Sequence, residues 1–486
     1  MNPSNVLLIM TDQQRFDTLG CYGNVEIETP NLDWLASQGT VFEKAYTPSP
    51  SCIPARACLL TGMSTWSTGI LGMGTGQGPM GVGFKHTLPG ELSSAGYHTQ
   101  GIGKMHFYPQ RALNGFHNTV LDESGRVEDD NFVSDYNQWF HENKNGSYEA
   151  VDHGIGWNSW MARPYHAPEY LHPTNWTVNE ALKFLNQRDP SKPFFLKVSF
   201  ARPHSPYDAV PYYFNHYNNK ELPEPWVGQW AEENAICTEL YDEDSWRGKH
   251  KDEETHRARA GYYGNINHID HQLGRLFRYL KSAGQLDNTM IIFTSDHGDM
   301  LGDHHLWRKT YAYEGSAHIP LLIKLPSNAK ENHVPRVTQP VLLQDIMPTI
   351  LSTCHLYIPD TVEGLNLLPA IRGGEIEREY IHGEHTECYS PEQEMQYLTD
   401  GKMKYIWFPR TGNEQLFNLK KDPKELYNLV TSDDNDVPKQ LRIWRERMIQ
   451  VFVDRNIDIG TIEGLTKWST TIQSPHYLKR VKKSFK

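Results

Sequence analysis

The sequence predicts an α/β protein with a large, mostly parallel sheet sandwiched by helices, followed by a smaller α+β subdomain. Over the first 370 residues, short apolar segments alternate with segments of helical periodicity, a pattern typical of parallel sheets covered by helices. After residue 370 the pattern changes to short alternating strands and one helix. The 486 residues also exceed the roughly 250–300 at which a single core stops growing. We therefore expect a main domain over residues 1–370 and a C-terminal subdomain, with an antiparallel sheet and a helix, over residues 371–486.

The individual elements follow from local patterns. Residues 5–10 (NVLLIM) are continuously apolar and suit a strand buried on both faces. Residues 29–39 indicate a helix with Thr29 at the N-cap, Pro30 in the first turn and Gly39 at the end. Further strands are expected at 193–200, 289–294 and 320–324, and further helices at 266–281 and 438–452. Because ligands bind beyond the carboxyl ends of such strands, the polar residues that follow them are the candidates for a functional site.

Composition excludes several classes of function. The formal net charge of −12 argues against a nucleic-acid binder, which needs a basic face. No segment approaches the roughly 18 apolar residues of a membrane span, so no membrane partner is expected. Six cysteines without paired spacing indicate reduced thiols. The amino terminus lacks the features of a secretory signal, so a cytoplasmic protein is expected, although a periplasmic or secreted chain trimmed of its signal would look the same.

Polar pairs follow two of the expected strands. Asp12 and Gln13 come after the first strand, and Asp296 and His297, followed by Gly298, come after the strand at 289–294. Carboxylate and amide oxygens with an imidazole are sufficient ligands for a divalent cation that keeps positions open for substrate. For Asp12 alone, a helix cap or an Asx-turn is the alternative.

A cysteine stands at the expected start of a helix in residues 52–62 (CIPARACLLTG). Cys52 there lies close to Arg56, and a thiol at a helix N-terminus beside an arginine is expected to be an activated nucleophile. The alternative for any single cysteine is a small buried hydrophobic residue. Cys58 lacks the same surroundings and keeps that second interpretation.

Three further segments carry basic residues. Lys104 and His106 lie in GIGKMH, His204 in PHSPY, and Lys309 in LWRK. Taken singly, such residues are common on solvated surfaces. Their occurrence together with the polar pairs and Cys52 favours one active site.

Together these segments resemble the sulfatase family. Residues 52–62 are similar to its signature, whose Cys-x-Pro-x-Arg core directs oxidation of the cysteine to formylglycine. Ala55 stands where serine is commonest, a departure that weakens the match little because that serine is the least essential member of the core. The TDQ, GxGKxH, PHxPY and SDHG segments agree with the family in order and spacing over residues 5–320, and the segments DGKMKYIW and LFNLKKDPKELYNL resemble its terminal subdomain. The resemblance implies the alkaline-phosphatase-like fold, with residues 1–370 as the catalytic domain.

The resemblance also implies roles for individual residues. A formylglycine-generating maturation enzyme would convert Cys52 to formylglycine, whose hydrate, a gem-diol, attacks sulfur. The implied metal ligands are Asp12, Gln13, Asp296, His297 and residue 52. Arg56 would fix the diol, and the sulfate oxygens would be bound by Lys104, His204 and Lys309. Either His204 or Lys309 would act as general acid, and His106 would take a proton as sulfate leaves.

The metal ligands depart from the commonest family pattern, in which Asp-Asp and Asp-Asn stand where this chain has Asp12–Gln13 and Asp296–His297. Calcium is the family expectation, but the imidazole shifts the set toward manganese or zinc. The same variant occurs in relatives that hydrolyse phosphonate monoesters and phosphodiesters.

The resemblance leaves the substrate open. The leading hypothesis is hydrolysis of an O-sulfate from a sulfated sugar, in particular an oligosaccharide, because Trp, Tyr and His side chains suit a pocket for sugar rings. The alternatives are a phosphonate monoester or phosphodiester hydrolase with the same formylglycine, a small aryl or choline sulfatase, or an inactive binding protein on the same scaffold. Residues 66–85 and 114–160 are expected to supply the loops that select the substrate.

Overall fold

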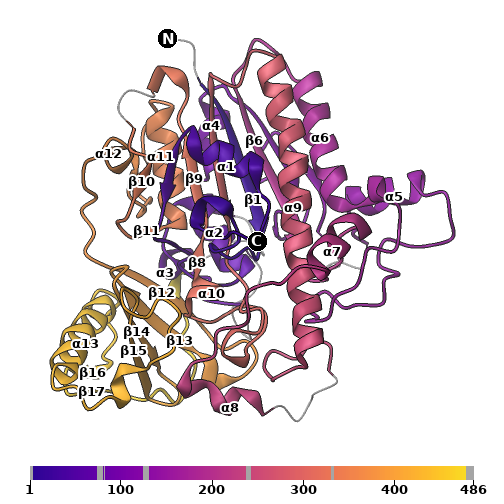
Figure 1. The fold of residues 1–486 in the computed structure, drawn as a ribbon. Helices are drawn as coiled ribbons and strands as arrows, with labels where there is room; N and C mark the ends of the chain where they lie inside the picture. Colours follow the sequence, from indigo (N-terminus) through magenta and orange to yellow (C-terminus); the bar gives the residue numbers. More distant parts are fainter. Residues whose placement is uncertain are drawn as a thin grey trace.

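An eight-stranded sheet forms the centre of the molecule (Figure 1). The computed structural model describes residues 4–73, 80, 83–123, 131–236, 242–329 and 333–477. Within them the strand order is β10-β2-β9-β7-β1-β6-β4-β5. The bounds are β10 (Arg336–Val337), β2 (Thr40–Phe42), β9 (Leu321–Lys324), β7 (Thr289–Ser295), β1 (Asn5–Asp12), β6 (Phe194–Pro203), β4 (His98–Gly103) and β5 (Asn118–Leu121). β9 pairs antiparallel with β7 and β2, and the other pairings are parallel.

Side chains of β1 alternate between two hydrophobic cores, one on each face of the sheet. Val6, Leu8 and Met10 belong to one core, and Leu7 and Ile9 to the other. The first face is covered by α2 (Cys52–Thr61), α4 (Leu88–Ser94) and α11 (Ile346–Thr353), and the second by α1 (Pro30–Ser37), α6 (Pro173–Gln187) and α9 (Asp252–Ser282). The predicted α/β architecture is therefore confirmed, and β1 is apolar throughout because both of its faces are buried.

Two local predictions need correction. Thr29 occupies the N-cap position of α1, but its hydroxyl accepts the backbone N–H of Gly20 at 2.9 Å and caps no helical amide. Instead, the Asp270 carboxylate of α9 accepts the backbone N–H groups of Asn31 at 3.2 Å and Leu32 at 2.8 Å. The helix predicted at 266–281 is the second half of α9, whose first half is too polar to show an apolar stripe.

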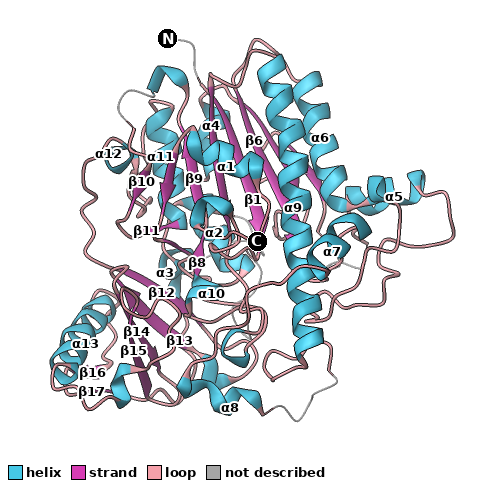
Figure 2. Cartoon of the chain, viewed as in Figure 1, coloured by secondary structure: helices cyan, strands magenta, loops and turns pink. Residues whose placement is uncertain are grey.

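A four-stranded antiparallel sheet follows the main sheet in the chain (Figure 2). Its order is β12 (Ile381–His385), β13 (Met395–Thr399), β14 (Met403–Phe408) and β15 (Asn413–Asn418), and α13 (Val437–Val453) packs against it. The expected C-terminal antiparallel sheet is thus present. Lys404 of β14 forms an ion pair with Glu314 at 2.7 Å, which joins this sheet to the main body. The division into residues 1–370 and 371–486 stays a prediction.

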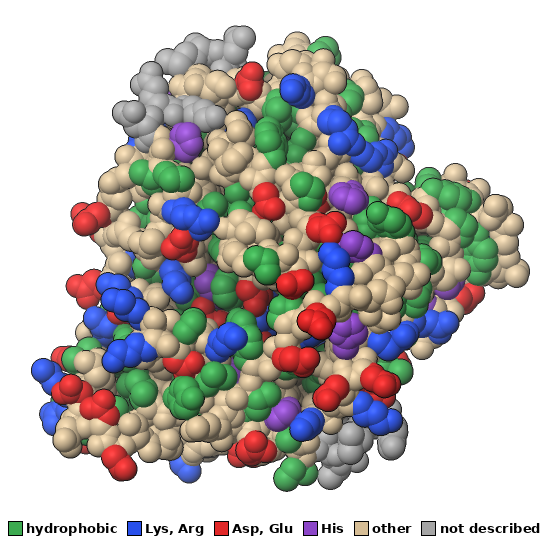
Figure 3. Space-filling view, in the orientation of Figure 1, with side chains coloured by type: hydrophobic (Ala, Val, Ile, Leu, Met, Phe, Trp, Pro, Cys, Tyr) green, Lys and Arg blue, Asp and Glu red, His purple; other side chains and the backbone are tan. Residues whose placement is uncertain are grey.

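The surface carries charges of both signs. On the face drawn in Figure 3, acidic and basic side chains are interspersed. Within the described ranges, no helix combines the length and the apolar character that crossing a bilayer requires.

Candidate active site

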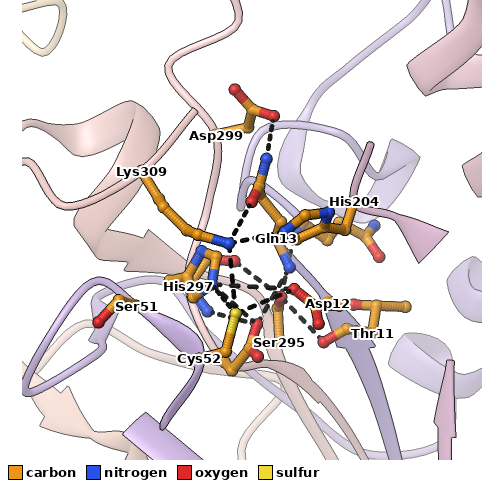
Figure 4. A network of polar contacts seen from close by, with 12 residues as sticks. Thr11, Asp12, Gln13, Ser51, Cys52, His204, Ser295, His297, Asp299 and Lys309 are labelled. Carbon is orange, nitrogen blue, oxygen red and sulfur yellow. Dashed lines mark hydrogen bonds and ion pairs between the residues drawn. The ribbon is translucent and has the colours of Figure 1, made fainter. Parts of the chain in front are cut away.

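Four neighbouring strands end at one edge of the main sheet, and a predicted site residue stands at each end. Asp12 is the last residue of β1, and Asp296 directly follows β7. Lys104 follows β4 and His204 follows β6 in the same way. These strands are adjacent and parallel, so their carboxyl ends meet. Cys52, the first residue of α2, lies at the same edge (Figure 4).

The Cys52 thiol lies at the centre of this cluster and is buried. Its Sγ is 3.2 Å from Nε2 of His297, 3.3 Å from Nζ of Lys309 and 3.7 Å from Oδ1 of Asp12. Burial and the Asp12 carboxylate raise the pKa of the thiol, but Lys104, Lys309 and His297 outweigh them and the pKa falls to about 6. These surrounding positive charges therefore favour the thiolate form of Cys52, whose role as nucleophile stays a prediction.

Asp12, Cys52, Asp296 and His297 form a possible metal-binding site, since their ligand atoms all lie within 4.8 Å of one another. Nδ1 of His297 is 2.9 Å from the carbonyl oxygen of Gly298. Because a carbonyl only accepts, Nδ1 donates, and Nε2 is the ring nitrogen that faces the cluster and could bind a metal. That nitrogen lies 3.8 Å from Oδ1 of Asp12 and 3.7 Å from Oδ1 of Asp296. Two carboxylates, an imidazole and a sulfur fit a divalent cation.

Gln13, the remaining predicted ligand, lies beside this cluster. Its backbone is left-handed, with φ 67°, and its N–H donates to Oδ1 of Asp296 at 3.0 Å. Its amide oxygen accepts a hydrogen bond from Nζ of Lys309 at 3.1 Å. The side-chain oxygen thus faces the same group of residues as the other ligands.

Arg56 neutralises both carboxylates of the cluster. Its Nε donates to Oδ2 of Asp296 at 2.8 Å, and its Nη2 to Oδ2 of Asp12 at 3.3 Å. Nη1 donates to the carbonyl oxygen of Lys104 at 2.6 Å and to the Ser199 hydroxyl at 3.0 Å. This buried guanidinium donates from all three of its nitrogens and joins β6 to the carboxyl ends of β1, β4 and β7.

The other cations of the site are paired. Lys104 forms an ion pair with Asp12. Nδ1 of His204 donates to the carbonyl oxygen of Ser205 at 2.9 Å, which leaves Nε2 to accept from Nζ of Lys309 at 2.6 Å. Burial, together with the Lys309 charge, holds the pKa of His204 well below its usual range. His204 is therefore neutral in this arrangement, and Lys309 carries the proton between them.

The turn after β4 requires a glycine at position 103. Gly103 has φ 88°, and a Cβ there would lie 2.0 Å from the carbonyl oxygen of Ser199, so only glycine fits. His106 also has positive φ, 63°. Its backbone N–H donates to Oε1 of Glu123 at 3.0 Å, and the same oxygen accepts the N–H of Met105 at 2.9 Å. His106 is buried beside Lys104 on this turn, and its proton-accepting role stays a prediction.

Two supporting residues were missed by sequence reasoning. Asp299 accepts a hydrogen bond from Nε2 of Gln13 at 2.6 Å, and its place three residues after Asp296 was a signal that could have been used. His385 of β12 contacts the Ser51 hydroxyl at 2.8 Å, immediately before Cys52. No local pattern marks His385, because its partner lies 334 residues away.

A cavity of about 470 Å³ opens over the site. Lys104, His204 and Lys309 line it together with Met73, Trp157, Asn158, Ala201, Asp244, Arg308, Cys388 and Tyr389. Met73 comes from the predicted loop 66–85, and Trp157 and Asn158 come from 114–160. Residues 74–79, 81–82 and 124–130 of these loops lie outside the described residues. The C-terminal region contributes Cys388 and Tyr389 to the wall.

Comparison with known families identifies the fold and its chemistry. The model of the sulfatase family matches residues 4–356, and the model described as "N-sulphoglucosamine sulphohydrolase, C-terminal" matches residues 302–451. An arylsulfatase of Clostridium perfringens is 47% identical over 445 residues, which are 88% of this chain and 91% of that protein. A choline-sulfatase of Rhizobium meliloti is 30% identical over 88% of this chain and 82% of that protein.

Solved structures agree with this at the level of the fold. The complex of BT4656 with its substrate D-glucosamine-2-N,6-O-disulfate has a TM-score of 0.73 at 21% identity, and covers 94% of this chain and 99% of that one. The phosphonate monoester hydrolase of Agrobacterium radiobacter has a TM-score of 0.72 at 24% identity, and covers 96% and 100%. The chain therefore belongs to the sulfatase family, within the alkaline-phosphatase-like superfamily, and is a sulfuric ester hydrolase.

Proposed function

We propose that this sulfatase removes an O-sulfate from a sulfated sugar, in particular an oligosaccharide, with residue 52 as formylglycine and one divalent metal. The observation that carries the proposal is the position of residue 52 at the first turn of α2, within 3.3 Å of the Lys309 ammonium and as a member of a possible metal site. Asp12, Gln13, Asp296 and His297 would hold the metal together with residue 52. Calcium is the expected ion, with manganese or zinc as the alternatives that an imidazole favours.

The proposed chemistry divides between these groups and the chain. Hydrated formylglycine supplies an oxygen nucleophile, and a bound divalent metal supplies positive charge to the sulfate oxygens. Lys104 and Lys309 are placed to donate hydrogen bonds to those oxygens, where negative charge gathers during sulfuryl transfer. Arg56 forms ion pairs with both metal-site carboxylates. His106 is the proposed proton acceptor when sulfate is released.

The departing alcohol needs a proton, and the hydrogen bond between Lys309 and His204 holds one. Because Nδ1 of His204 is committed to the carbonyl oxygen of Ser205, the proton between the two side chains belongs to Nζ of Lys309. Both residues line the cavity, where the leaving oxygen would lie. We assign the general-acid role to this pair, with Lys309 as the donor.

The cavity wall supports a sugar as the substrate. Trp157 and Tyr389 offer aromatic surface, and Asn158, Asp244 and Arg308 offer hydrogen-bonding groups, a combination that suits a ring with several hydroxyl groups. Arg308 is held in place, since its Nη1 donates to the carbonyl oxygen of Asp244 at 2.9 Å and its guanidinium lies 4.5 Å from the Tyr389 ring centre. The relative named for D-glucosamine-2-N,6-O-disulfate has the same fold.

A second candidate function is hydrolysis of phosphonate monoesters or phosphodiesters at the same site. The Gln13 and His297 pair favours it, because this pair occurs in relatives with that activity. The same pocket could accept a phosphoryl centre in place of sulfur, since both are tetrahedral and anionic.

The test combines mass spectrometry with a substrate panel. The chain is co-expressed with a formylglycine-generating enzyme, and the peptide that contains both Cys52 and Cys58 is examined. Conversion at residue 52, with Cys58 unchanged as the internal control, supports the proposal. The converted protein is then assayed on sulfated sugars, an aryl sulfate, choline sulfate and a phosphonate monoester. An unconverted Cys52 in the presence of a competent enzyme would overturn the mechanism, and turnover of the phosphonate alone would favour the second candidate.

A further inference from the structure

Asp299 lies three residues after Asp296 and is completely buried. Its Oδ2 accepts hydrogen bonds from Nε2 of Gln13 at 2.6 Å and from the Tyr207 hydroxyl at 2.5 Å. Its Oδ1 accepts the backbone N–H groups of Leu301 at 2.9 Å and Arg308 at 3.1 Å. The carboxylate therefore holds one side chain of the predicted metal site and the loop that leads to Lys309.

The contacts of Gln13 fix which way its amide points. An amide has a donor end and an acceptor end, and the Asp299 carboxylate only accepts, so the NH₂ of Gln13 must face Asp299. The oxygen then faces the other way, toward Nζ of Lys309 at 3.1 Å. Lys309 only donates, so both neighbours require the same orientation.

The same carboxylate sets the backbone beside Lys309. Arg308 has φ 69° and Thr310 has φ 84°, a conformation that side-chain-bearing residues rarely adopt without support. The N–H of Arg308 is held by Asp299, and the N–H of Thr310 donates to the carbonyl oxygen of Pro50 at 2.8 Å. Lys309 is thereby placed between two anchored residues.

We propose that Asp299 is a positioning residue that orients the Gln13 amide, so that its oxygen is presented to the divalent metal. The inference rests on the proposed function for the presence of the metal. Partners that orient metal ligands typically contribute 10–100-fold to metal affinity, and we expect a contribution of that size from Asp299.

The test is a pair of substitutions that exchange the donor and the acceptor. In Asp299→Asn, the new amide oxygen still accepts hydrogen bonds from the backbone N–H groups of Leu301 and Arg308, so the new NH₂ group faces Gln13. Gln13 must turn its own oxygen toward Asn and its NH₂ toward the metal, so the Kd for Ca²⁺ should rise about 10–100-fold. Adding Gln13→Glu gives a side chain with oxygen at both ends, which accepts from Asn and still presents an oxygen to the metal. The double variant should therefore bind Ca²⁺ more tightly than Asp299→Asn alone.

Asp270→Asn is the matched control. Asp270 is equally buried and also accepts two backbone N–H groups and one side-chain amide, from Asn31 and Leu32, but it caps α1. Its substitution should lower the melting temperature without changing the Kd for Ca²⁺.

Calorimetric titration with Ca²⁺ and Mn²⁺ is performed on the full-length protein, and melting temperatures are recorded alongside. Wild-type affinity in Asp299→Asn, or a double variant that binds no better than Asp299→Asn, would overturn the inference while leaving the proposed function intact. If Asp299→Asn does not fold, the double variant and Gln13→Glu remain to be compared. In Gln13→Glu two carboxylates face each other, so it should bind more weakly than the double variant, and the reverse order contradicts the inference. If the wild type bound neither ion, both the proposed metal site and this inference about Asp299 would be contradicted.

Discussion

Replacement of Glu384 by glutamine should weaken the attachment of the C-terminal sheet to the segment that precedes Cys52. Glu384 of β12 is buried and accepts from Nη1 of Arg455 at 2.7 Å and from Nη2 at 2.9 Å. Its backbone N–H donates to the carbonyl oxygen of Pro48 at 3.0 Å, and the next residue, His385, contacts Ser51. The change keeps the shape of the side chain and removes the charge that pairs with Arg455.

The size of the effect follows from the pKa. Burial raises the pKa of Glu384, but Arg455 outweighs it, and the pKa falls from 4.5 to about 2. A shift of this size corresponds to about 3 kcal/mol of stability, near the lower end of the roughly 3–5 kcal/mol lost when a buried pair is broken. Because the pKa is lowered in the folded state, this stability is complete above pH 4.5 and is lost as the pH falls toward 2.

The assay is hydrogen exchange of the β12 peptide, which reports local opening, at several pH values. Glu384→Gln should lower the free energy of opening by about 3 kcal/mol at pH 7, and the difference from wild type should shrink to about half near pH 3. Glu392→Gln, an exposed change between β12 and β13, should alter the free energy of opening by less than about 0.5 kcal/mol. The reasoning would be refuted if Glu384→Gln had wild-type hydrogen-exchange protection in β12 at pH 7. It would also be refuted if the difference in opening free energy between variant and wild type did not depend on pH below 4.5.

The remaining predictions concern the site itself. Arg56→Met leaves Asp12 and Asp296 buried without their cation, so unfolding experiments should show a loss of about 3–5 kcal/mol and assays should show no turnover; a stable, active variant would contradict the pairing. Gly298→Ala places a Cβ 2.1 Å from the carbonyl oxygen of Gly315, and kcat/KM should fall about 100-fold as the neighbouring His297 shifts. Near-normal activity would show that the backbone of this turn can adjust to the added Cβ. Chelation of the matured enzyme should lower both its melting temperature and its activity, with recovery on adding Ca²⁺; in Asp12→Ala the melting temperature should no longer respond.

Much of the fold could be predicted because buried strands are continuously apolar. Residues 5–10 illustrate this, since both faces of β1 pack against hydrophobic cores. The antiparallel direction of β9 could not be predicted, because a continuous apolar segment indicates a buried strand but not whether it pairs parallel or antiparallel with its neighbours. The first half of α9 was missed for a different reason: it packs through small residues such as Ala258, Ala260 and Gly261 and is held by an ion pair between Arg259 and Asp303 at 2.8 Å.

The site could be predicted where its residues follow strands within recognisable motifs. Asp12, Lys104, His204 and Asp296 converge because their strands are parallel neighbours, and motif order carried that information. Asp299 could have been suspected from its place three residues after Asp296, whereas His385 required knowledge of a partner 334 residues away. Their contribution is a hydrogen bond to another residue of the site, and such a bond leaves no periodic trace.

The contact between His385 and Ser51 has a consequence for the order of synthesis. The ribosome makes the segment around Cys52 first and adds its partner 334 residues later, a delay on the order of tens of seconds at about 5–20 residues per second. During that interval the newly made segment lacks its final cover, whereas the finished chain buries Cys52 completely. If Cys52 is converted to formylglycine as proposed, the maturation enzyme would reach this cysteine most easily while translation is still in progress, before β12 packs beside Ser51.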